Sequence, residues 1–272
     1  MNTALPLLRR GLVYLGLSIA TFVSVFPFYW MIVGSTNKSA DIVTGKATPG
    51  FELFNNIATF FATVDVPRVF WNSTFLAVVG TIVTLLVSSL AGYGFEMFRS
   101  RFRERIFALL LLLLSIPFAA LMVPLFVLIS QMKLVNTAAA VILPGIASIF
   151  IVFYFRQATK AFPSELRDAA RVDGLKEWQI FVYVYLPVMR STYAAATIIV
   201  FLANWNNYLW PLIVLQTVEN KTVTLVVSAL TSAYVPDYGM ILVGTVLATL
   251  PTLTIFFLLQ RQFVEGLTGS VK

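Results

Sequence analysis

One stretch of the chain, residues 106–130, reads IFALLLLLLSIPFAALMVPLFVLIS and contains no charged residue. A helix needs about 20 apolar residues to cross the hydrocarbon core of a membrane, so this stretch predicts one span. Five other stretches meet the same criterion, at residues 11–34, 71–96, 138–156, 191–215 and 239–260. The sequence therefore predicts an all-α polytopic membrane protein with six transmembrane helices, organised as a single transmembrane domain over residues 1–272.

The composition excludes a soluble domain. Of the 272 residues, 59% are hydrophobic and 11% are charged, whereas soluble globular domains carry about 45–50% and about 25%. An apolar excess of this size cannot be hidden inside one soluble domain, so most of it must face lipid. The same figures exclude a disordered chain and a small disulfide scaffold.

The residue types that are missing restrict the chemistry. The chain has no His and no Cys, which excludes Ser-His-Asp triads, disulfides, thiol nucleophiles and metal sites built from these ligands. Neither a G-x-x-x-x-G-K-[ST] phosphate loop nor a G-x-G-x-x-G fingerprint occurs. We therefore expect no enzymatic activity, no metal, and no cofactor or nucleotide bound by this chain.

The basic residues predict the orientation in the membrane. With the N-terminus inside, 14 of the 19 Lys and Arg residues fall in inner segments, as the positive-inside rule requires. Both termini are therefore expected in the cytoplasm, and the net charge of +7 is a topology signal, not a nucleic-acid footprint. The inner basic residues are Arg9, Arg10, Arg99, Arg101, Arg103, Arg105, Arg156, Lys160, Arg167, Arg171, Lys176, Arg190, Arg261 and Lys272.

Two features of the spans concern their shape. The first span follows Arg9 and Arg10 and runs for 24 residues. That is longer than the core of a cleaved signal peptide (about 7–15 residues), so we expect a retained helix. Five of the six spans contain a proline, which predicts bends, although single prolines are common in membrane helices. The second span instead carries small residues, among them Gly80, Ser88, Ser89, Gly92 and Gly94, which allow close helix contact.

The loop between the fourth and fifth spans, residues 156–190, contains the most informative segment. From Phe162 to Gly174 it reads FPSELRDAARVDG. A short helix after Pro163 would place Leu166, Ala169, Ala170 and Asp173 on one face, and Gly174 would end it in the left-handed conformation. A second short helix follows, to Leu186-Pro187. The residues alone favour an amphipathic helix on the lipid headgroups; seating in a groove of a partner protein is the alternative.

The spacing of this loop resembles a known motif. Asp168-Ala169-Ala170, Gly174, Val184 and Leu186-Pro187 match E-A-A-x3-G-x9-I-x-L-P, the cytoplasmic loop motif of permease subunits of bacterial ABC importers. Asp stands for Glu and Val for Ile. Several further blocks resemble the carbohydrate-type branch, in particular the smaller six-span subunit of maltose-type importers. They are Asn72-Ser73, Ala91-Gly92-Tyr93, Met122-Val123-Pro124, Leu134-Val135-Asn136-Thr137, Trp205-Asn206-Asn207-Tyr208-Leu209-Trp210-Pro211 and Gly266-Leu267-Thr268-Gly269.

The resemblance implies an assembly in the bacterial inner membrane. It comprises a second permease subunit, two ATPase subunits that bind ATP with magnesium, and a periplasmic or lipid-anchored sugar-binding protein. The permease core would span residues 66–262. The short helix would seat in the ATPase. The residues that would couple the permease to the ATPase are Asp168, Ala169, Ala170, Gly174, Leu186 and Pro187. The C-terminal tail, with Gly266, Leu267 and Gly269, would enter the ATPase dimer interface. Its two glycines and serine predict flexibility, and a frayed terminus is the alternative.

The fifth span carries an unusual cluster of amides and aromatic rings. Its residues Asn204, Trp205, Asn206, Asn207, Tyr208 and Trp210 are the candidate lining of a translocation pathway. Amides in a membrane helix must face protein or water, and amides with rings suit the hydroxyls and C–H faces of a sugar. The alternative is an aromatic belt at the outer interface with amides that join helices. In the maltose-type importer the other permease subunit holds most of the sugar.

Together these observations predict a permease subunit of an ATP-driven importer. It would translocate a sugar, an oligosaccharide or glycoside, delivered by an external binding protein. The alternative is one half of a secondary sugar transporter, which normally has acidic residues or His inside its spans. Here only Glu96 comes near, and an ion pair with Arg99 at the cytoplasmic edge explains it better. An intramembrane protease lacks support because the spans contain no paired Asp.

Overall fold

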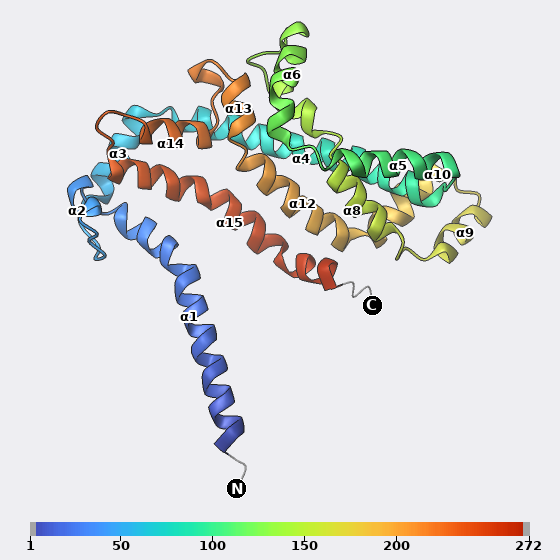
Figure 1. Ribbon diagram of the computed structural model, residues 1–272, viewed down its shortest axis with the longest axis horizontal. Helices are drawn as coiled ribbons and strands as arrows, with labels where there is room; N and C mark the ends of the chain where they lie inside the picture. Colours follow the sequence, from blue (N-terminus) through green and yellow to red (C-terminus); the bar gives the residue numbers. More distant parts are fainter. Residues whose placement is uncertain (1–3, 269–272) are drawn as a thin grey trace. The chain divides into compact units, whose positions relative to one another are not determined.

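The structure is a computed structural model that describes the backbone of residues 4–268 and the side chains of residues 9–261 (Figure 1). Within these described residues all regular structure is helical and no strand occurs. The chain forms two compact units. The first contains the residues up to Val66 together with Val226–Leu250, and the second contains Pro67–Leu225 together with the residues from Pro251 on. The permease core expected at 66–262 stays a prediction.

Four helical segments are long and apolar enough to cross a membrane, and two bent helix pairs bring the number of spans to six. The six-span prediction is confirmed in this sense. The long segments are α1 (Ala4–Gly34), α4 (Val66–Met97), α12 (Arg190–Trp205) followed by α13 (Leu209–Val214), and α15 (Tyr238–Thr268). The bent pairs are α5 (Arg101–Leu113) with α6 (Phe118–Gln131), and α7 (Ala138–Ile142) plus the 3-10 turn Leu143–Gly145 with α8 (Ile149–Thr159).

Prolines cause some of the predicted bends but not all of them. The α5–α6 pair bends by 103° at a break that ends at Pro117, and the pair ending in α8 bends by 44° after a turn that contains Pro144. Proline lacks an N–H and disfavours helical geometry at the residue before it, so the break at Pro117 has a local cause. Leu143, which precedes Pro144, keeps helical geometry, and the second break follows at 146–148. Pro27, Pro124 and Pro251 instead lie inside continuous helices.

The remaining elements are short, and their bounds complete the fold. They are α2 (Ser39–Val43), α3 (Leu53–Thr63), α9 (Ser164–Val172), α10 (Glu177–Ile180), the π-helix Phe181–Tyr185, α11 (Leu186–Val188), the 3-10 turn Val218–Asn220, and α14 (Val223–Thr231). A nine-residue helix such as α9 is too short to be stable alone, so its position depends on the contacts it makes.

In the first unit a buried amide fixes the chain that follows α1. Asn56 of α3 donates hydrogen bonds to the carbonyl oxygens of Ser35 and Asn37, at 2.9 and 3.0 Å. The start of α15 packs closely on α3, because a Cβ atom at Gly239 would lie 2.5–2.7 Å from the side chain of Asn56. Ser39 of α2 also donates to the carboxylate of Asp237.

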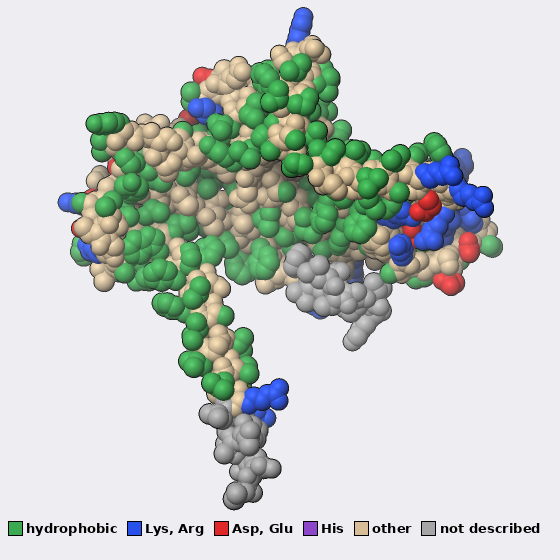
Figure 2. Space-filling model, viewed as in Figure 1, with side chains coloured by type: hydrophobic (Ala, Val, Ile, Leu, Met, Phe, Trp, Pro, Cys, Tyr) green, Lys and Arg blue, Asp and Glu red, His purple; other side chains and the backbone are tan. Residues whose placement is uncertain are grey.

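The second unit contains three buried clusters arranged along α4. They are centred on Trp210, Phe155 and Tyr185. The small residues of α4 allow close contact as expected: Ser88 and Ser89 are fully buried, and a Cβ at Gly92 would lie 2.7 Å from Cβ of Phe155 on α8. Charged side chains of this unit gather at the end where α5, α9 and α10 lie (Figure 2).

Candidate functional site

The helix α9 carries three of the predicted coupling residues. Pro163 precedes it as the N-cap, and Asp168 and Ala169 are exposed. Ala170 is only 6% exposed because α9 packs on α10 and the π-helix. Ala170 therefore does not share the exposure of Leu166 and Ala169 on the predicted face: its small side chain lets α9 approach its own chain, while Ala169 and the 88% exposed Val172 point away from it. The coupling role of Ala170 stays a prediction.

Gly174 ends α9 in the predicted left-handed conformation, with φ of +83°. Its N–H donates to the carbonyl of Arg171 at 3.0 Å, and the N–H of Leu175 donates to Ala170 at 3.0 Å. This pair of bonds is a Schellman motif, which satisfies carbonyls at a helix end and favours glycine at the turn. Gly174 thereby reverses the chain between α9 and α10.

The second short helix of the loop forms as predicted but includes a π-helical turn. It runs through α10, the π-helix and α11, and so reaches Leu186 and Pro187. Leu186 is partly buried and packs against the cluster centred on Tyr185, whereas Pro187 is exposed. Both residues thus lie where the loop returns to the bundle, and α10 and the π-helix separate them in sequence from Asp168 on α9.

A single carboxylate connects α9 to the rest of the second unit. Glu177 at the start of α10 forms ion pairs with Arg167, at 3.2 Å, and with Arg171, at 2.5 Å. The hydroxyl of Tyr93 on α4 donates to the same carboxylate at 3.2 Å. These four residues form what we term the Glu177 cluster. Both arginines of α9 are therefore engaged within the chain.

The charge state of Glu177 follows from these contacts. Burial acts to raise the pKa of its carboxyl, but the hydrogen bonds and positive charges of Arg171 and Arg167 outweigh that effect. The pKa of Glu177 consequently lies below its ordinary value. The carboxylate stays ionised at neutral pH and stays available to both arginines.

A second ion cluster joins the C-terminal ends of α4 and α8 to the N-terminal end of α5. Arg156 is 6% exposed and pairs with Glu96 at 3.4 Å and with Glu104 at 2.5 Å. Its guanidinium lies 4.0 Å from the ring centroid of Phe107. Glu96 also pairs with Arg99, so the ion pair predicted at this edge is confirmed.

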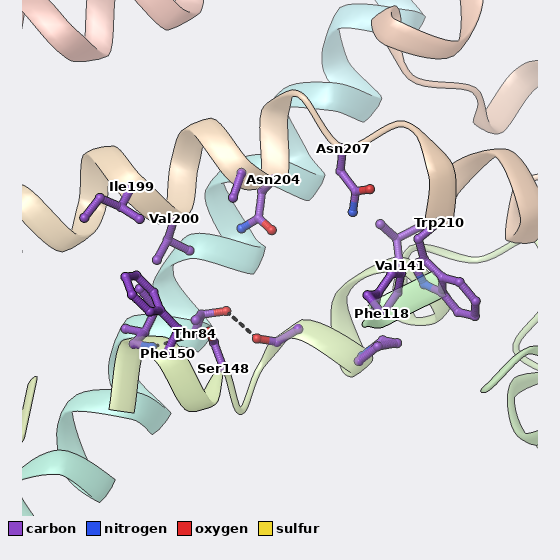
Figure 3. Close-up of a pocket in the computed structure, with 14 residues that line it drawn as sticks. Thr84, Phe118, Val141, Ser148, Phe150, Ile199, Val200, Asn204, Asn207 and Trp210 are labelled. Carbon is purple, nitrogen blue, oxygen red and sulfur yellow. Dashed lines mark hydrogen bonds between the residues drawn. The ribbon is translucent and has the colours of Figure 1, made fainter. Parts of the chain in front are cut away.

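A cavity of about 330 Å³ lies in the second unit beside the break between α12 and α13. Asn204, Asn207 and Trp210 contribute to its wall, and Figure 3 shows both amide side chains extending toward it. Other wall residues come from α4, α6, α7, α8, α12 and the turn before α8, and none of them is charged. They are Thr84, Phe118, Val141, Pro144, Gly145, Ser148, Phe150, Ile151, Ile199, Val200 and Ala203.

The polar groups of this cavity differ in how they are satisfied. Asn204 donates to the hydroxyl of Thr81 at 3.4 Å, and the indole N–H of Trp210 donates to the carbonyl of Ala140 at 2.8 Å. The Asn207 side chain makes no hydrogen bond to any residue within the described part of the chain. Only the backbone carbonyl of Asn207 accepts one, from the hydroxyl of Thr224 at 3.3 Å. Its amide is therefore available to a ligand.

Three residues of the predicted pathway do not face the cavity. Trp205 is buried and stacks on Phe201 with ring centroids 5.9 Å apart. Asn206 is exposed and donates to the carbonyl of Leu202 at 3.0 Å, which caps α12. Tyr208 packs against the Trp210 cluster. The structure thus brings together Asn204, Asn207 and Trp210, and the role of these residues in translocation stays a prediction.

Comparison with known families assigns the chain. Residues 85–269 match the family described as "Binding-protein-dependent transport system inner membrane component". The chain belongs to this family. It is a multi-pass permease of the inner membrane that serves a binding-protein-dependent importer, and it is not an enzyme.

Several relatives of this permease are named as permease proteins of transport systems for particular substrates. It is 67% identical over 259 residues to the "Lactose transport system permease protein LacG" of Rhizobium radiobacter, covering 95% of each chain. It is 37% identical over 267 residues to the "Arabinooligosaccharides transport system permease protein AraQ" of Halalkalibacterium halodurans, covering 96% of each. The "sn-glycerol-3-phosphate transport system permease protein UgpE" of Agrobacterium fabrum is 28% identical over 277 residues, with 97% and 98% covered.

A solved structure supports the fold of the permease. A chain of "a bacterial ABC transporter involved in the import of the acidic polysaccharide alginate" superimposes with a TM-score of 0.83. The match covers 97% of this permease and 99% of that chain at 18% identity, which shows the ABC importer permease fold.

The tail of the permease is only partly described. Gly266 and Leu267 lie in α15, whose backbone is helical to Thr268, and Gly269 lies outside the described residues. The backbone of 265–268 is therefore helical, and the flexibility of the tail stays a prediction. A single glycine costs about 1 kcal/mol in a helix, and each residue added to an existing helix gains a hydrogen bond, so Gly266 does not end α15.

Two functional candidates of this permease were missed from the sequence alone. Glu177 had no assigned partner, and Arg156 was counted only as an inner positive charge. The signal for Glu177 was its place three residues after Gly174, at the start of the second helix, where it faces back toward α9. For Arg156 the signal was a basic residue inside an apolar helix, which requires acidic partners.

Proposed function

We propose that this permease translocates a neutral sugar of the oligosaccharide or glycoside class, with lactose as the first candidate. The observation that carries the proposal is the 67% identity, over 95% of both chains, to a permease named for lactose transport. A second relative is named for arabinooligosaccharides, which belong to the same chemical class.

The chemistry of the cavity favours a neutral ligand. A phosphate or carboxylate is normally held by Arg, Lys or several donors, and the wall of this cavity contains no charged residue. The amides of Asn204 and Asn207 suit sugar hydroxyls, and the exposed ring of Phe118 suits a sugar C–H face. This argues against sn-glycerol 3-phosphate, the substrate named for the less similar relatives.

The proposal includes an assembly that supplies energy and substrate. A second permease subunit, two ATPase subunits that bind ATP with magnesium, and a periplasmic or lipid-anchored binding protein would act with this chain. The helix α9 and its flanks, with Asp168, Ala169, Ala170, Gly174, Leu186 and Pro187, would couple to the ATPase. The tail, with Gly266, Leu267 and Gly269, would also reach the ATPase, and both termini would lie in the cytoplasm.

Uptake by cells tests the substrate. In a strain that lacks this gene, the gene supplied in trans should restore ATP-dependent uptake of radiolabelled lactose and should leave uptake of sn-glycerol 3-phosphate unchanged. The purified chain alone, in liposomes with a proton or sodium gradient, should move no sugar. Restored uptake of sn-glycerol 3-phosphate, or gradient-driven uptake by the chain alone, would overturn the proposal.

The absence of cysteine from the sequence allows a direct test of orientation. Tyr234 and Val172 are highly exposed, on the segments expected outside and inside respectively. In intact cells a membrane-impermeant maleimide should label the Tyr234→Cys variant and spare the Val172→Cys variant, which should react only after permeabilisation. The reverse pattern would invert the topology.

A further inference from the structure

The guanidinium of Arg167 is almost withdrawn from solvent. Its side chain is 12% exposed, and its guanidinium lies 4.9 Å from the ring centroid of Phe98, just after α4. A cation in this position needs a counterion, because burial of an unpaired charge is costly. Within the described part of the chain, the carboxylate that pairs with it is that of Glu177.

The same carboxylate is shared with two other elements. Arg171, one helical turn beyond Arg167, donates to it from Nε at 2.8 Å and from the second guanidinium nitrogen at 2.5 Å. Tyr93 donates to the other carboxylate oxygen at 3.2 Å. One acidic group therefore bonds to both basic residues of α9 and to a residue of α4.

The α4 side of this contact is firmly packed. Tyr93 is 4% exposed, and its ring centroid lies 4.8 Å from that of Tyr185 and 5.3 Å from that of Phe181. The hydroxyl of Tyr185 shares a 2.7 Å hydrogen bond with Thr159 of α8. Tyr93 consequently cannot move unless the π-helix and α8 move with it. The Glu177 cluster is therefore anchored to a tightly packed part of the bundle.

We propose that Glu177 is a positioning residue that fixes α9 to the inner end of α4, so that a displacement of α9 is passed to a membrane span. In this role Glu177 acts through Arg167, Arg171 and Tyr93 and need not touch the ATPase. The inference rests on the proposed function, in which α9 receives the movement of the ATPase. It adds the element that connects α9 to the bundle.

Without the charge of Glu177, α9 loses its ion pairs to α10 and, with them, its connection to Tyr93 on α4. Arg167 would then be drawn toward solvent to regain hydration, and the nine residues of α9 would keep their place only through apolar contacts such as that of Ala170. We therefore expect α9 to adopt a range of positions while the spans still fold. If the ion pairs of Glu177 only stabilised the fold, their loss would lower the melting temperature and leave the position of α9 unchanged.

A distance measurement separates these outcomes. Spin labels are attached to the variant Phe102→Cys/Val172→Cys. Phe102 is an exposed site on α5, and Val172 is an exposed site at the end of α9. The distance between the two labels should show one narrow distribution in the assembled complex. Adding Glu177→Gln should broaden it, and Glu177→Asp should restore much of the narrow peak. Glu165→Gln is the matched control, since Glu165 is an exposed acid of α9 without an ion pair in the described residues. It should leave the distribution narrow.

The transport complex supplies the second readout. In the complex assembled with its partners, the sugar-loaded binding protein should stimulate ATP hydrolysis. The Glu177→Gln variant should reduce this stimulation by at least about fivefold, which is an ordinary size for a coupling effect. If Glu177→Gln does not assemble, Tyr93→Phe removes only the hydroxyl and should broaden the distribution to a smaller extent. An unbroadened distribution with full stimulation overturns the inference. Absence of stimulation in the unaltered complex would instead overturn the proposed function.

Discussion

Thr84 and Tyr93 lie nine residues apart on the unbroken helix α4, one in the wall of the cavity and the other in the Glu177 cluster. At about 1.5 Å per residue they are separated by about 14 Å along the axis. A continuous helix transmits axial displacement without a hinge, so α4 joins the loop of α9 to the cavity by one rigid element. Thr84 also donates to the carbonyl of Gly145 at 3.2 Å, which ties α4 to the turn before α8 (Figure 3).

The first prediction concerns the contact of α4 with α8, between these two residues. A Cβ at Gly92 would lie 2.7 Å from Cβ of Phe155 and 2.8 Å from the backbone nitrogen of Arg156, whereas a Cβ at Gly94 would meet nothing within 4 Å. Gly92→Ala should therefore force the helices apart and cost about 1–3 kcal/mol of stability. Gly94→Ala should be neutral or stabilising by up to about 1 kcal/mol. Thermal unfolding of the two purified variants in detergent compares them directly, and equal melting temperatures would contradict the packing.

The second prediction concerns the buried ion cluster. Arg156→Leu leaves Glu96, whose side chain is 7% exposed, with Arg99 as its remaining partner, and it leaves Glu104 without its 2.5 Å contact. Removing one partner from a buried pair typically costs about 3–5 kcal/mol. Arg105→Leu removes an exposed arginine that has no ion pair in the described residues, and it should change stability by less than about 0.5 kcal/mol. Denaturation of both variants in detergent measures the difference. A small effect of Arg156→Leu would show that water reaches the cluster.

The spans were predictable because they depend on length and hydropathy alone. Their internal geometry was not, because a proline in the sequence does not reveal whether its helix continues. Pro117 ends a break, yet Pro124, seven residues later, lies within α6. In a membrane, neighbouring helices and local adjustments satisfy the carbonyl that a proline frees. The outcome therefore depends on packing that the sequence does not state.

The coupling loop was predictable up to the point where tertiary contacts begin. Gly174 takes the predicted conformation because a left-handed turn is a local property of glycine. The helix α9 is expected from the sequence to lie on lipid headgroups or in a groove of a partner, whereas both of its arginines pair with Glu177. Likewise, Asn206 and Asn207 are equivalent in sequence, and the end of α12 after Trp205 separates their roles. These pairings require the chain to fold first.

The third prediction concerns the turn after α9. Gly174 has φ of +83°, a region that costs an ordinary residue about 1–2 kcal/mol and a β-branched residue more. Gly174→Val should therefore shift the end of α9, and uptake in cells should fall although the protein reaches the membrane. Gly16→Val in α1 is the control, because a Cβ there meets nothing and the backbone is helical. Uptake and membrane abundance are measured in the same cells. Native uptake by Gly174→Val would argue against the coupling role of this loop.

The last prediction uses the two neighbouring amides at the end of α12. Asn207 faces the cavity with no side-chain hydrogen bond in the described residues, whereas Asn206 is exposed and caps α12 through the carbonyl of Leu202. A sugar that passes the cavity would gain a hydrogen bond from Asn207 worth about 0.5–1.5 kcal/mol. Asn207→Ala should consequently reduce uptake by roughly two- to tenfold at limiting sugar, since 1.4 kcal/mol corresponds to about a factor of 10.

Asn206→Ala removes the same side-chain atoms one residue away and should leave uptake within about twofold of the native rate, because its hydrogen bond contributes only to the end of the helix. Initial rates of lactose uptake, corrected for the amount of protein in the membrane, measure both variants side by side. Binding-protein-stimulated ATP hydrolysis should remain in Asn207→Ala, since the Glu177 cluster is untouched. Equal loss of uptake in the two variants would indicate a structural role for this segment and would remove the cavity from the translocation pathway.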